Sequence, residues 1–144
     1  MDTVKRRVRV GLIGFGTIGT GVVRLLQEQQ AQLRTRVGAP VDLVRVADVD
    51  VRRDRGVRLD AGVLIADGRA IVDDPDIDVV VELMGGYGLA RDFALRAIAN
   101  GKSVVTANKA LLAVHGAEIF AAAEGAGVDV GFEASVGGGI PIIR

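Results

Sequence analysis

The sequence of 144 residues has no cysteine and a single histidine, His115. Without cysteine the chain has no disulfide, no thiolate metal ligand and no thiol nucleophile, and one histidine excludes a histidine-rich metal site. Aromatic residues make up only 3% of the chain. The 18 basic residues are matched by 18 acidic residues, so the net charge does not favour a nucleic acid as a partner.

Long hydrophobic runs are also missing, and no stretch is apolar enough to span a membrane. The basic residues 5–7, followed by the apolar residues 8–23, imitate a secretory signal peptide. The apolar run contains five glycines, however, and it continues into a helical pattern at residues 24–30 without a small-residue cleavage site. We therefore predict a cytoplasmic protein with no membrane partner.

Glycine, by contrast, is abundant, and short apolar runs alternate with amphipathic segments. The patterns predict strands at residues 8–13, 43–47, 79–83, 103–106 and 128–132, and helices at 18–33, 89–99 and 110–124. Gly101 and Gly125 are expected at helix C-termini. Residues 50–76 have no clear pattern, and 63–65 fit a strand or a helical turn. The alternation predicts a doubly wound parallel α/β sheet of the Rossmann type, a single dinucleotide-binding domain over residues 1–144.

A glycine-rich turn, Gly14-Phe15-Gly16-Thr17-Ile18-Gly19, follows the first predicted strand and opens a helix. In the dinucleotide fingerprint the first glycine makes a tight turn, the second lets the backbone approach the pyrophosphate, and the third allows close packing of helix and strand. The helix N-terminus offers free N–H groups to the phosphates. The alternative is a glycine-rich turn without a ligand, which this strand-and-helix context disfavours.

Asp48 closes the second predicted strand, where an acid accepts hydrogen bonds from the adenosine ribose. It lies 29 positions after Gly19, beyond the usual ~20, which a long first helix explains. The acid favours NAD, whereas Arg52 and Arg53 can bind the 2′-phosphate of NADP if their loop folds back. A solvated basic loop is the alternative for both arginines. Gly85, in the turn after the third main strand, is either a ligand position or part of a tight turn.

Lys109 stands in an unusual position for a lysine. Thr106 ends a predicted strand and Asn108 is a predicted N-cap, which places Lys109 in the first helical turn, where a cation opposes the helix dipole. We interpret Lys109 as a candidate to hold a substrate carboxylate or carbonyl oxygen, or to lie beside the nicotinamide. The alternative is a lysine bent into solvent. His115 is expected to be a cap or surface residue.

The last residues form a second glycine-rich turn that carries one carboxylate, Glu133. Together with carbonyl groups of residues 135–140, Glu133 can surround a hard cation with oxygen ligands. A flexible loop is the alternative. The strand before the turn and Pro141 after it, at a helix start, favour an ordered turn.

Taken together, these motifs resemble homoserine dehydrogenase. The resemblance rests on residues 11–19, 76–86, 101–109 and 133–142, in this order along essentially the whole chain. The first motif is common to many dehydrogenases, whereas the last two are highly specific.

The resemblance implies reversible hydride transfer between NAD or NADP and L-aspartate 4-semialdehyde, which gives L-homoserine. It implies that Phe15, Thr17 and Ile18 line the pyrophosphate, and that Thr106 and Lys109 reach the nicotinamide side, with Lys109 at the catalytic centre. It also implies a sodium ion held by Glu133 and the carbonyls of Val136, Gly138 and Ile140.

Members of the family are much longer, so the resemblance implies a nucleotide-binding domain truncated before the substrate domain. The general acid and the groups that grip the amino acid are then expected beyond Arg144, and this chain is expected to bind dinucleotide without useful turnover. Exposed surface leaves self-association open. Aspartate-semialdehyde dehydrogenase, which needs a cysteine, and sugar-type dehydrogenases fit less well. A dinucleotide-sensing regulatory module is the non-catalytic alternative; it has no need of Lys109 or Glu133.

Overall fold

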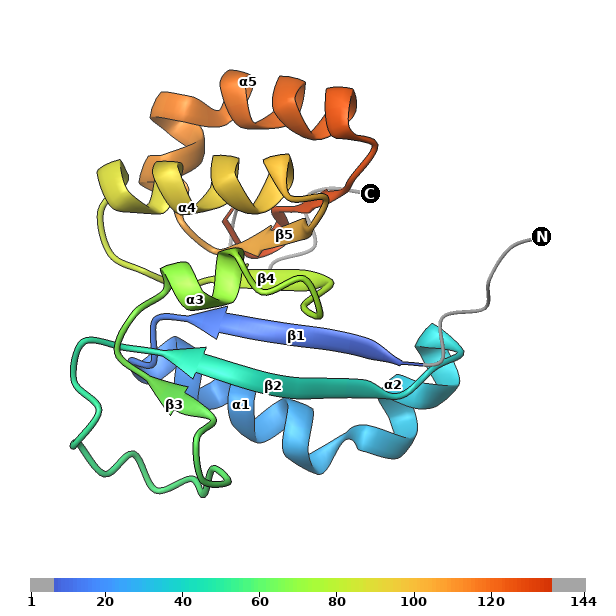
Figure 1. The fold of residues 1–144 in the computed structure, drawn as a ribbon, viewed down its shortest axis with the longest axis vertical. Helices are drawn as coiled ribbons and strands as arrows, with labels where there is room; N and C mark the ends of the chain where they lie inside the picture. The colour runs from blue at the N-terminus through green and yellow to red at the C-terminus, as the bar shows by residue number, and fades with distance from the viewer. Residues whose placement is uncertain (1–6, 136–144) are drawn as a thin grey trace.

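Residues 7–135 contain a single six-stranded sheet, and all of its strands are parallel (Figure 1). The computed structural model describes residues 7–135. The strand order β3-β2-β1-β4-β5-β6 reverses direction between β1 and β4, as in dinucleotide-binding folds. The strands are β1 Val8–Ile13, β2 Val41–Ala47, β3 Leu64–Ile65, β4 Val79–Glu82, β5 Ser103–Thr106 and β6 Val130–Gly131. The predicted doubly wound parallel sheet is confirmed.

Helices cover both faces of the sheet (Figure 1). They are α1 Thr17–Glu28, α2 Gln30–Val37, α3 Arg69–Val72, α4 Gly88–Ala99 and α5 Lys109–Ala126, and a short 3-10 helix, η1, spans Glu133–Ser135. The first two helices lie on one face, and α3, α4 and α5 lie on the other. This alternation of strand and helix places the carboxyl ends of all the strands at one edge, where ligands bind in such folds.

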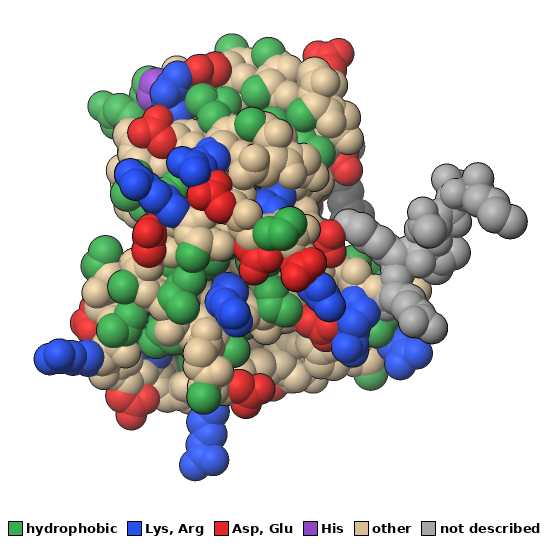
Figure 2. Space-filling model, viewed as in Figure 1, with side chains coloured by type: hydrophobic (Ala, Val, Ile, Leu, Met, Phe, Trp, Pro, Cys, Tyr) green, Lys and Arg blue, Asp and Glu red, His purple; other side chains and the backbone are tan. Residues whose placement is uncertain are grey.

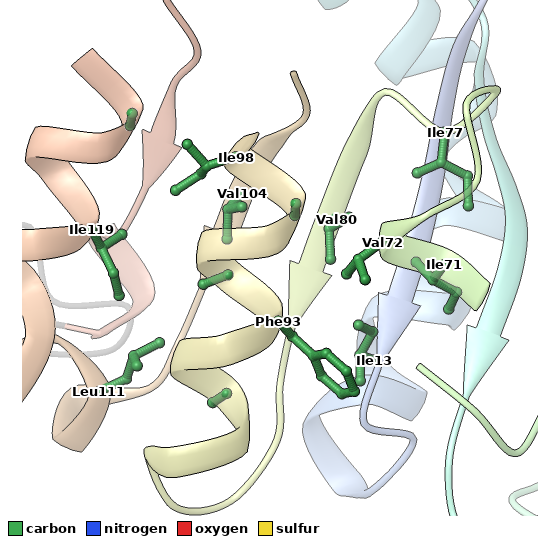
Figure 3. Packing of buried hydrophobic residues seen from close by; sticks show 14 of the residues in the cluster. Ile13, Ile71, Val72, Ile77, Val80, Phe93, Ile98, Val104, Leu111 and Ile119 are labelled. Atoms are coloured by element: carbon green, nitrogen blue, oxygen red, sulfur yellow. The ribbon is translucent and has the colours of Figure 1, made fainter. Parts of the chain in front are cut away.

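Two apolar clusters hold the layers together, because successive strand side chains point to opposite faces. Leu12 of β1 packs in the cluster under α1, whereas its neighbour Ile13 packs in the cluster under α3 and α4. In Figure 3, Ile13 and Phe93 of α4 point toward each other. Both clusters are fully apolar, and each large buried side chain contributes about 1.5–3 kcal/mol of transfer free energy. The largest fully buried apolar residues are Leu12, Val23, Val46, Ile71, Val72, Val80, Ile98, Val104, Leu111 and Ile119.

Several element boundaries differ from those expected. The helix predicted at 18–33 is two helices, which break at Gln29. Gly125 lies inside α5, and Gly127, two residues later, ends the helix in the left-handed conformation at φ 67°. Gly101 does follow α4, at φ 76°. The unclear range 50–76 contains β3 and α3, so the strand interpretation of residues 63–65 is confirmed in part.

Charged side chains of both signs are interspersed on the face shown in Figure 2, as the equal numbers of acidic and basic residues lead one to expect. Within residues 7–135, no helix has both the length and the apolar character needed to cross a membrane.

Candidate dinucleotide-binding site

The glycine turn between β1 and α1 lies at the point where the strand order reverses. Gly14 has φ 101°, and a β-carbon there would lie 2.5 Å from the carbonyl oxygen of Leu83, in the loop after β4. A β-carbon on Gly19 would lie 2.1 Å from the carbonyl oxygen of Gly14. Both glycines are therefore required by the fold itself, because a side chain would collide with backbone.

Gly16 differs from these two glycines. A β-carbon on Gly16 would meet nothing within 4 Å, and its φ of −83° is open to other residues. Gly16 is also the N-cap of α1, where no side chain caps the helix and no acid stands in the first turn. Helix starts without a side-chain cap offer their first N–H groups to anionic ligands in other proteins of this fold. Thr17 and Ile18, the first residues of α1, are exposed at this site.

Asp48, just beyond β2, holds the glycine turn in place. One carboxylate oxygen accepts the N–H of Phe15 at 2.8 Å. The other accepts the N–H of Asp50 at 2.8 Å. The side chain is 18% exposed and lines the larger cavity of this edge, so Asp48 keeps a face toward a ligand while it fixes the backbone of Phe15.

Arg55 completes this arrangement from the loop after β2. Its Nε donates to the carbonyl oxygen of Phe15, and its Nη2 lies 3.3 Å from the carboxylate of Asp48 and 2.7 Å from the carbonyl oxygen of Asp50. The guanidinium carbon stands 4.5 Å from the centre of the Phe15 ring, within the range of a cation–π contact. The Arg55 side chain is only 5% exposed. The loop after β2 therefore folds back onto the glycine turn.

Two cavities lie along the carboxyl edge and share the residues Leu83, Met84 and Gly85. The larger, of about 400 Å³, is mainly apolar and is lined by Gly14, Gly16, Ala47, Asp48, Val49, Asp67, Gly68, Leu89 and Phe93. The smaller, of about 250 Å³, is lined by Ile18, Gly86, Ala107, Asn108 and Lys109. Because Gly85 lines both, the turn after β4 lies between the two cavities.

A third cavity, of about 280 Å³, is basic. It lies beside the first turn of α1 and is lined by Phe15, Gly16, Thr17, Thr20, Gly21, Arg24, Arg53 and Arg55. Arg53 lines this cavity and Arg52 does not. The loop after β2 is thus folded back, which is the condition for phosphate binding by these arginines, and it brings only one of the two to the glycine turn.

Lys109 is the first residue of α5 and is exposed at the smaller cavity. The predicted N-cap is confirmed, because Asn108 Oδ1 accepts the N–H of Leu111 at 3.0 Å. The side-chain amide of Asn108 donates to the carbonyl oxygens of Met84, at 3.4 Å, and of Gly86. The helix start and the turn after β4 are thereby joined. His115 lies within α5, beside Tyr87 with ring centroids 5.8 Å apart, so it is not a helix cap.

Beneath the smaller cavity lies a buried acid, Glu82, at the end of β4. It is 1% exposed. Met84 N–H donates to one of its carboxylate oxygens at 2.7 Å and Thr106 Oγ1 to the other at 2.6 Å. Burial raises the pKa of Glu82, and these hydrogen bonds only partly oppose that rise. Thr106, expected to reach the nicotinamide side, is itself buried with its hydroxyl bound to Glu82.

The raised pKa of Glu82 predicts a pH-dependent stability. A carboxyl whose folded-state pKa lies above its unfolded value stabilises the fold fully at low pH, and this contribution is lost as the pH rises through the folded-state pKa. The contribution of Glu82 to the free energy of unfolding should therefore fall with rising pH in that window, by at most about 1.4 kcal/mol per pH unit for one proton. In denaturant titrations, the free energy of unfolding of the wild type should fall with rising pH relative to that of Glu82→Gln. Equal pH profiles for the two proteins would contradict the prediction.

The predicted cation site can be followed only in part. Glu133 begins η1 and is exposed. Val136, Gly138 and Ile140 lie outside the described residues. Among residues 7–135, no three or more side chains of His, Cys, Asp or Glu gather in a way that could hold a metal ion.

Sequence reasoning missed Arg55 and Glu82. Arg55 is one of several arginines in a patternless loop, and nothing in the sequence separates it from its neighbours. Glu82 did carry a signal: it is an acid at the end of a strand whose other residues are all valine. A buried strand end that keeps a carboxylate must supply partners for it, because an unpaired buried charge is costly.

Comparison with known proteins agrees with this geometry. A family model for the NAD binding domain of homoserine dehydrogenase matches residues 14–133. The homoserine dehydrogenase of Bacillus subtilis (strain 168) is 45% identical over 139 residues, which are 96% of this chain and 32% of that protein. That of Synechocystis sp. is 50% identical over 137 residues, 95% of this chain and 31% of that protein.

The crystal structure of a homoserine dehydrogenase from Thiobacillus denitrificans superposes with a TM-score of 0.86 at 46% identity, over 94% of this chain and 31% of that one. The chain thus spans about a third of the length of the curated relatives that it matches. Since the family model covers residues 14–133, the chain belongs to the homoserine dehydrogenase family, in which it corresponds to the NAD-binding domain.

Proposed function

We propose that this chain binds NAD or NADP along the carboxyl edge of its sheet, as the nucleotide-binding part of an enzyme that interconverts L-homoserine and L-aspartate 4-semialdehyde. The observation that carries the proposal is Gly16. The fold has open space at this position and an uncapped helix N-terminus beside it. Neither feature serves the packing of the protein, and both suit a dinucleotide diphosphate.

The cavities on either side of this helix start suit the two halves of the cofactor. The larger apolar cavity has the lining that an adenosine needs, and Asp48 offers it a carboxylate for ribose hydroxyls. The smaller cavity carries Lys109 at its rim and suits the nicotinamide half. Gly14, Phe15, Gly16, Thr17, Ile18, Gly19, Asp48, Gly85, Thr106 and Lys109 are the proposed cofactor-site residues.

Lys109 is the group of this chain that we assign to the reaction. The bound nicotinamide supplies the hydride acceptor or donor. The exposed ammonium group at the smaller cavity can donate a hydrogen bond to the oxygen of a substrate alcohol or aldehyde, which positions the carbon for hydride transfer. A sensing module would need the glycine turn alone. Membership of a dehydrogenase family and a lysine at this cavity favour the enzyme.

The remaining parts of the proposal concern ions and assembly. Glu133, with the carbonyls of Val136, Gly138 and Ile140, is the proposed sodium site, and the exposed carboxylate of Glu133 is available for it. A small amino-acid substrate, self-association and a cytoplasmic location belong to the same proposal.

Calorimetric titration of the 144-residue chain with NAD, NADP and ADP-ribose tests the proposed function. We expect saturable binding of the dinucleotides with one site per chain. Repeating the titration in the presence of sodium and then of a larger monovalent cation tests the proposed sodium site at Glu133. Absence of binding at millimolar concentrations of all three ligands would overturn the proposal.

Arg53 is predicted to determine how well NADP binds. Its place in the basic cavity beside the glycine turn suits a 2′-phosphate, whereas Arg52, which does not line that cavity, is its matched control. Arg53→Ala should weaken NADP binding by roughly tenfold, the loss expected for one charge-assisted hydrogen bond. NAD binding should change little. Equal effects of the substitutions at positions 52 and 53 on the NADP-to-NAD ratio would count against this assignment.

A further inference from the structure

The nicotinamide end of the candidate site rests on a buried hydrogen-bond network around Glu82. We define the Glu82 network as Glu82, Met84, Thr106, Asn108 and Ser135. We propose that Glu82 is a positioning residue, which sets the smaller cavity by fixing the turn after β4 against the start of α5. This inference rests on the proposed dinucleotide binding.

The carboxylate is the point at which two strands are joined. Each of its oxygens receives one donor, the N–H of Met84 at 2.7 Å and the hydroxyl of Thr106 at 2.6 Å. The first contact bends the chain after β4 into the turn that lines the cavity. The second ties the end of β5 to the same carboxylate. Glu82 is 1% exposed, so water does not compete for these bonds.

From Thr106 the network reaches the two segments that follow β5. The N–H of Asn108 donates to Thr106 Oγ1 at 3.0 Å, which places the residue before Lys109. The hydroxyl of Ser135 donates to the carbonyl oxygen of Thr106 at 2.7 Å, in a buried contact. The Asn108 amide then returns to the carbonyl of Gly86, in the turn where the network began. The network thus fixes the positions of Lys109, Gly86 and η1 relative to Glu82.

The chemistry at Glu82 requires a carboxylate. Glutamine has one acceptor oxygen and one donor nitrogen at its end, so it can serve only one of the two donors that face Glu82. If its oxygen takes the N–H of Met84, its nitrogen becomes a second donor that faces Thr106 Oγ1, which already accepts the N–H of Asn108. The Thr106 hydroxyl then loses the acceptor of its own proton and has to turn away, and we expect the start of α5 to shift with it.

The test compares NADH with ADP-ribose, which lacks the nicotinamide. The wild-type chain should bind NADH more tightly than ADP-ribose by about tenfold. Glu82→Gln should bring this ratio close to one and change the fluorescence of bound NADH, while the Kd for ADP-ribose stays within about twofold. Thr106→Val should act likewise, whereas Thr106→Ser, which keeps the hydroxyl, should restore most of the ratio.

Lys102 supplies the matched control. It is also buried, at 2% exposure, and donates to the carbonyl oxygen of Ile77 at 2.8 Å, but it lies at the opposite end of β5. Lys102→Met should lower stability and leave the ratio unchanged. Parallel losses of NADH and ADP-ribose affinity in Glu82→Gln, or an unchanged ratio, would overturn the inference. If Glu82→Gln does not fold, the pair Thr106→Val and Thr106→Ser decides.

The two proposals fail in different ways. If the wild-type chain binds neither ligand, the proposed function is wrong. If it binds both with equal affinity, or if the ratio survives loss of the Thr106 hydroxyl, the dinucleotide site stands and the role of Glu82 is wrong.

Discussion

Replacement of Gly19 by alanine is expected to destabilise the chain by about 3 kcal/mol, at the upper end of what overpacking usually costs. The added β-carbon would lie 2.1 Å from the carbonyl oxygen of Gly14. That oxygen belongs to the backbone of the turn, and Gly14 is itself packed against Leu83, so neither atom can move aside cheaply. The α1 helix would have to separate from β1, which would open the apolar cluster beneath it.

Gly21, two residues further along α1, is the matched control. It is exposed, and a β-carbon there would meet nothing within 4 Å. Gly21→Ala should therefore stabilise the chain by up to about 1 kcal/mol through helix propensity alone. Denaturant unfolding of both variants separates collision from propensity. A Gly19→Ala variant within about 1 kcal/mol of the wild type would refute the close contact.

The sheet could be predicted from the sequence because its central strands contain continuous apolar runs. Runs such as residues 79–81 are buried on both faces, and no other element accounts for three consecutive valines. The small edge strand β3 could not be assigned, since its two residues take their conformation from backbone bonds to β2. The helix break at Gln29 carries no glycine or proline, and we find no local sequence signal for it.

The candidate site could be predicted where backbone geometry determines the residue. The glycines that are required to avoid a collision recur at a characteristic spacing, which can be recognised in the sequence. Asn108 can be recognised as well, because it is a typical N-cap residue before a predicted helix. Contacts between distant loops have no such pattern in the sequence. Arg55 lies 40 positions from Phe15, whose carbonyl it binds, and only the fold-back of the loop after β2 brings the two together. The position of Asp48 at a strand end predicts its ribose role, whereas its bond to the N–H of Phe15 depends on the fold of the distant glycine turn.

Replacement of Gly16 by valine is expected to abolish dinucleotide binding while the fold stays intact. A β-carbon at this position would meet open space, and the φ of −83° is open to L-residues, so the free energy of unfolding should fall by only about 1 kcal/mol, through loss of a glycine N-cap. The isopropyl group would instead fill the space over the helix start where the diphosphate is proposed to lie. Affinity for NAD, NADP and ADP-ribose should all fall, by about a hundredfold or more.

The contrast with Gly19 is what makes this result decisive. A glycine kept for packing loses stability when it gains a side chain, and any loss of binding follows from unfolding. A glycine kept for a ligand loses binding alone. Gly125→Val, at an exposed and equally open position of α5, controls for the introduction of valine. Thermal unfolding should show that both variants are folded, and titration should show that only the Gly125 variant binds dinucleotide. If Gly16→Val bound dinucleotide as the wild type does, the diphosphate would have to lie away from the N-terminus of α1.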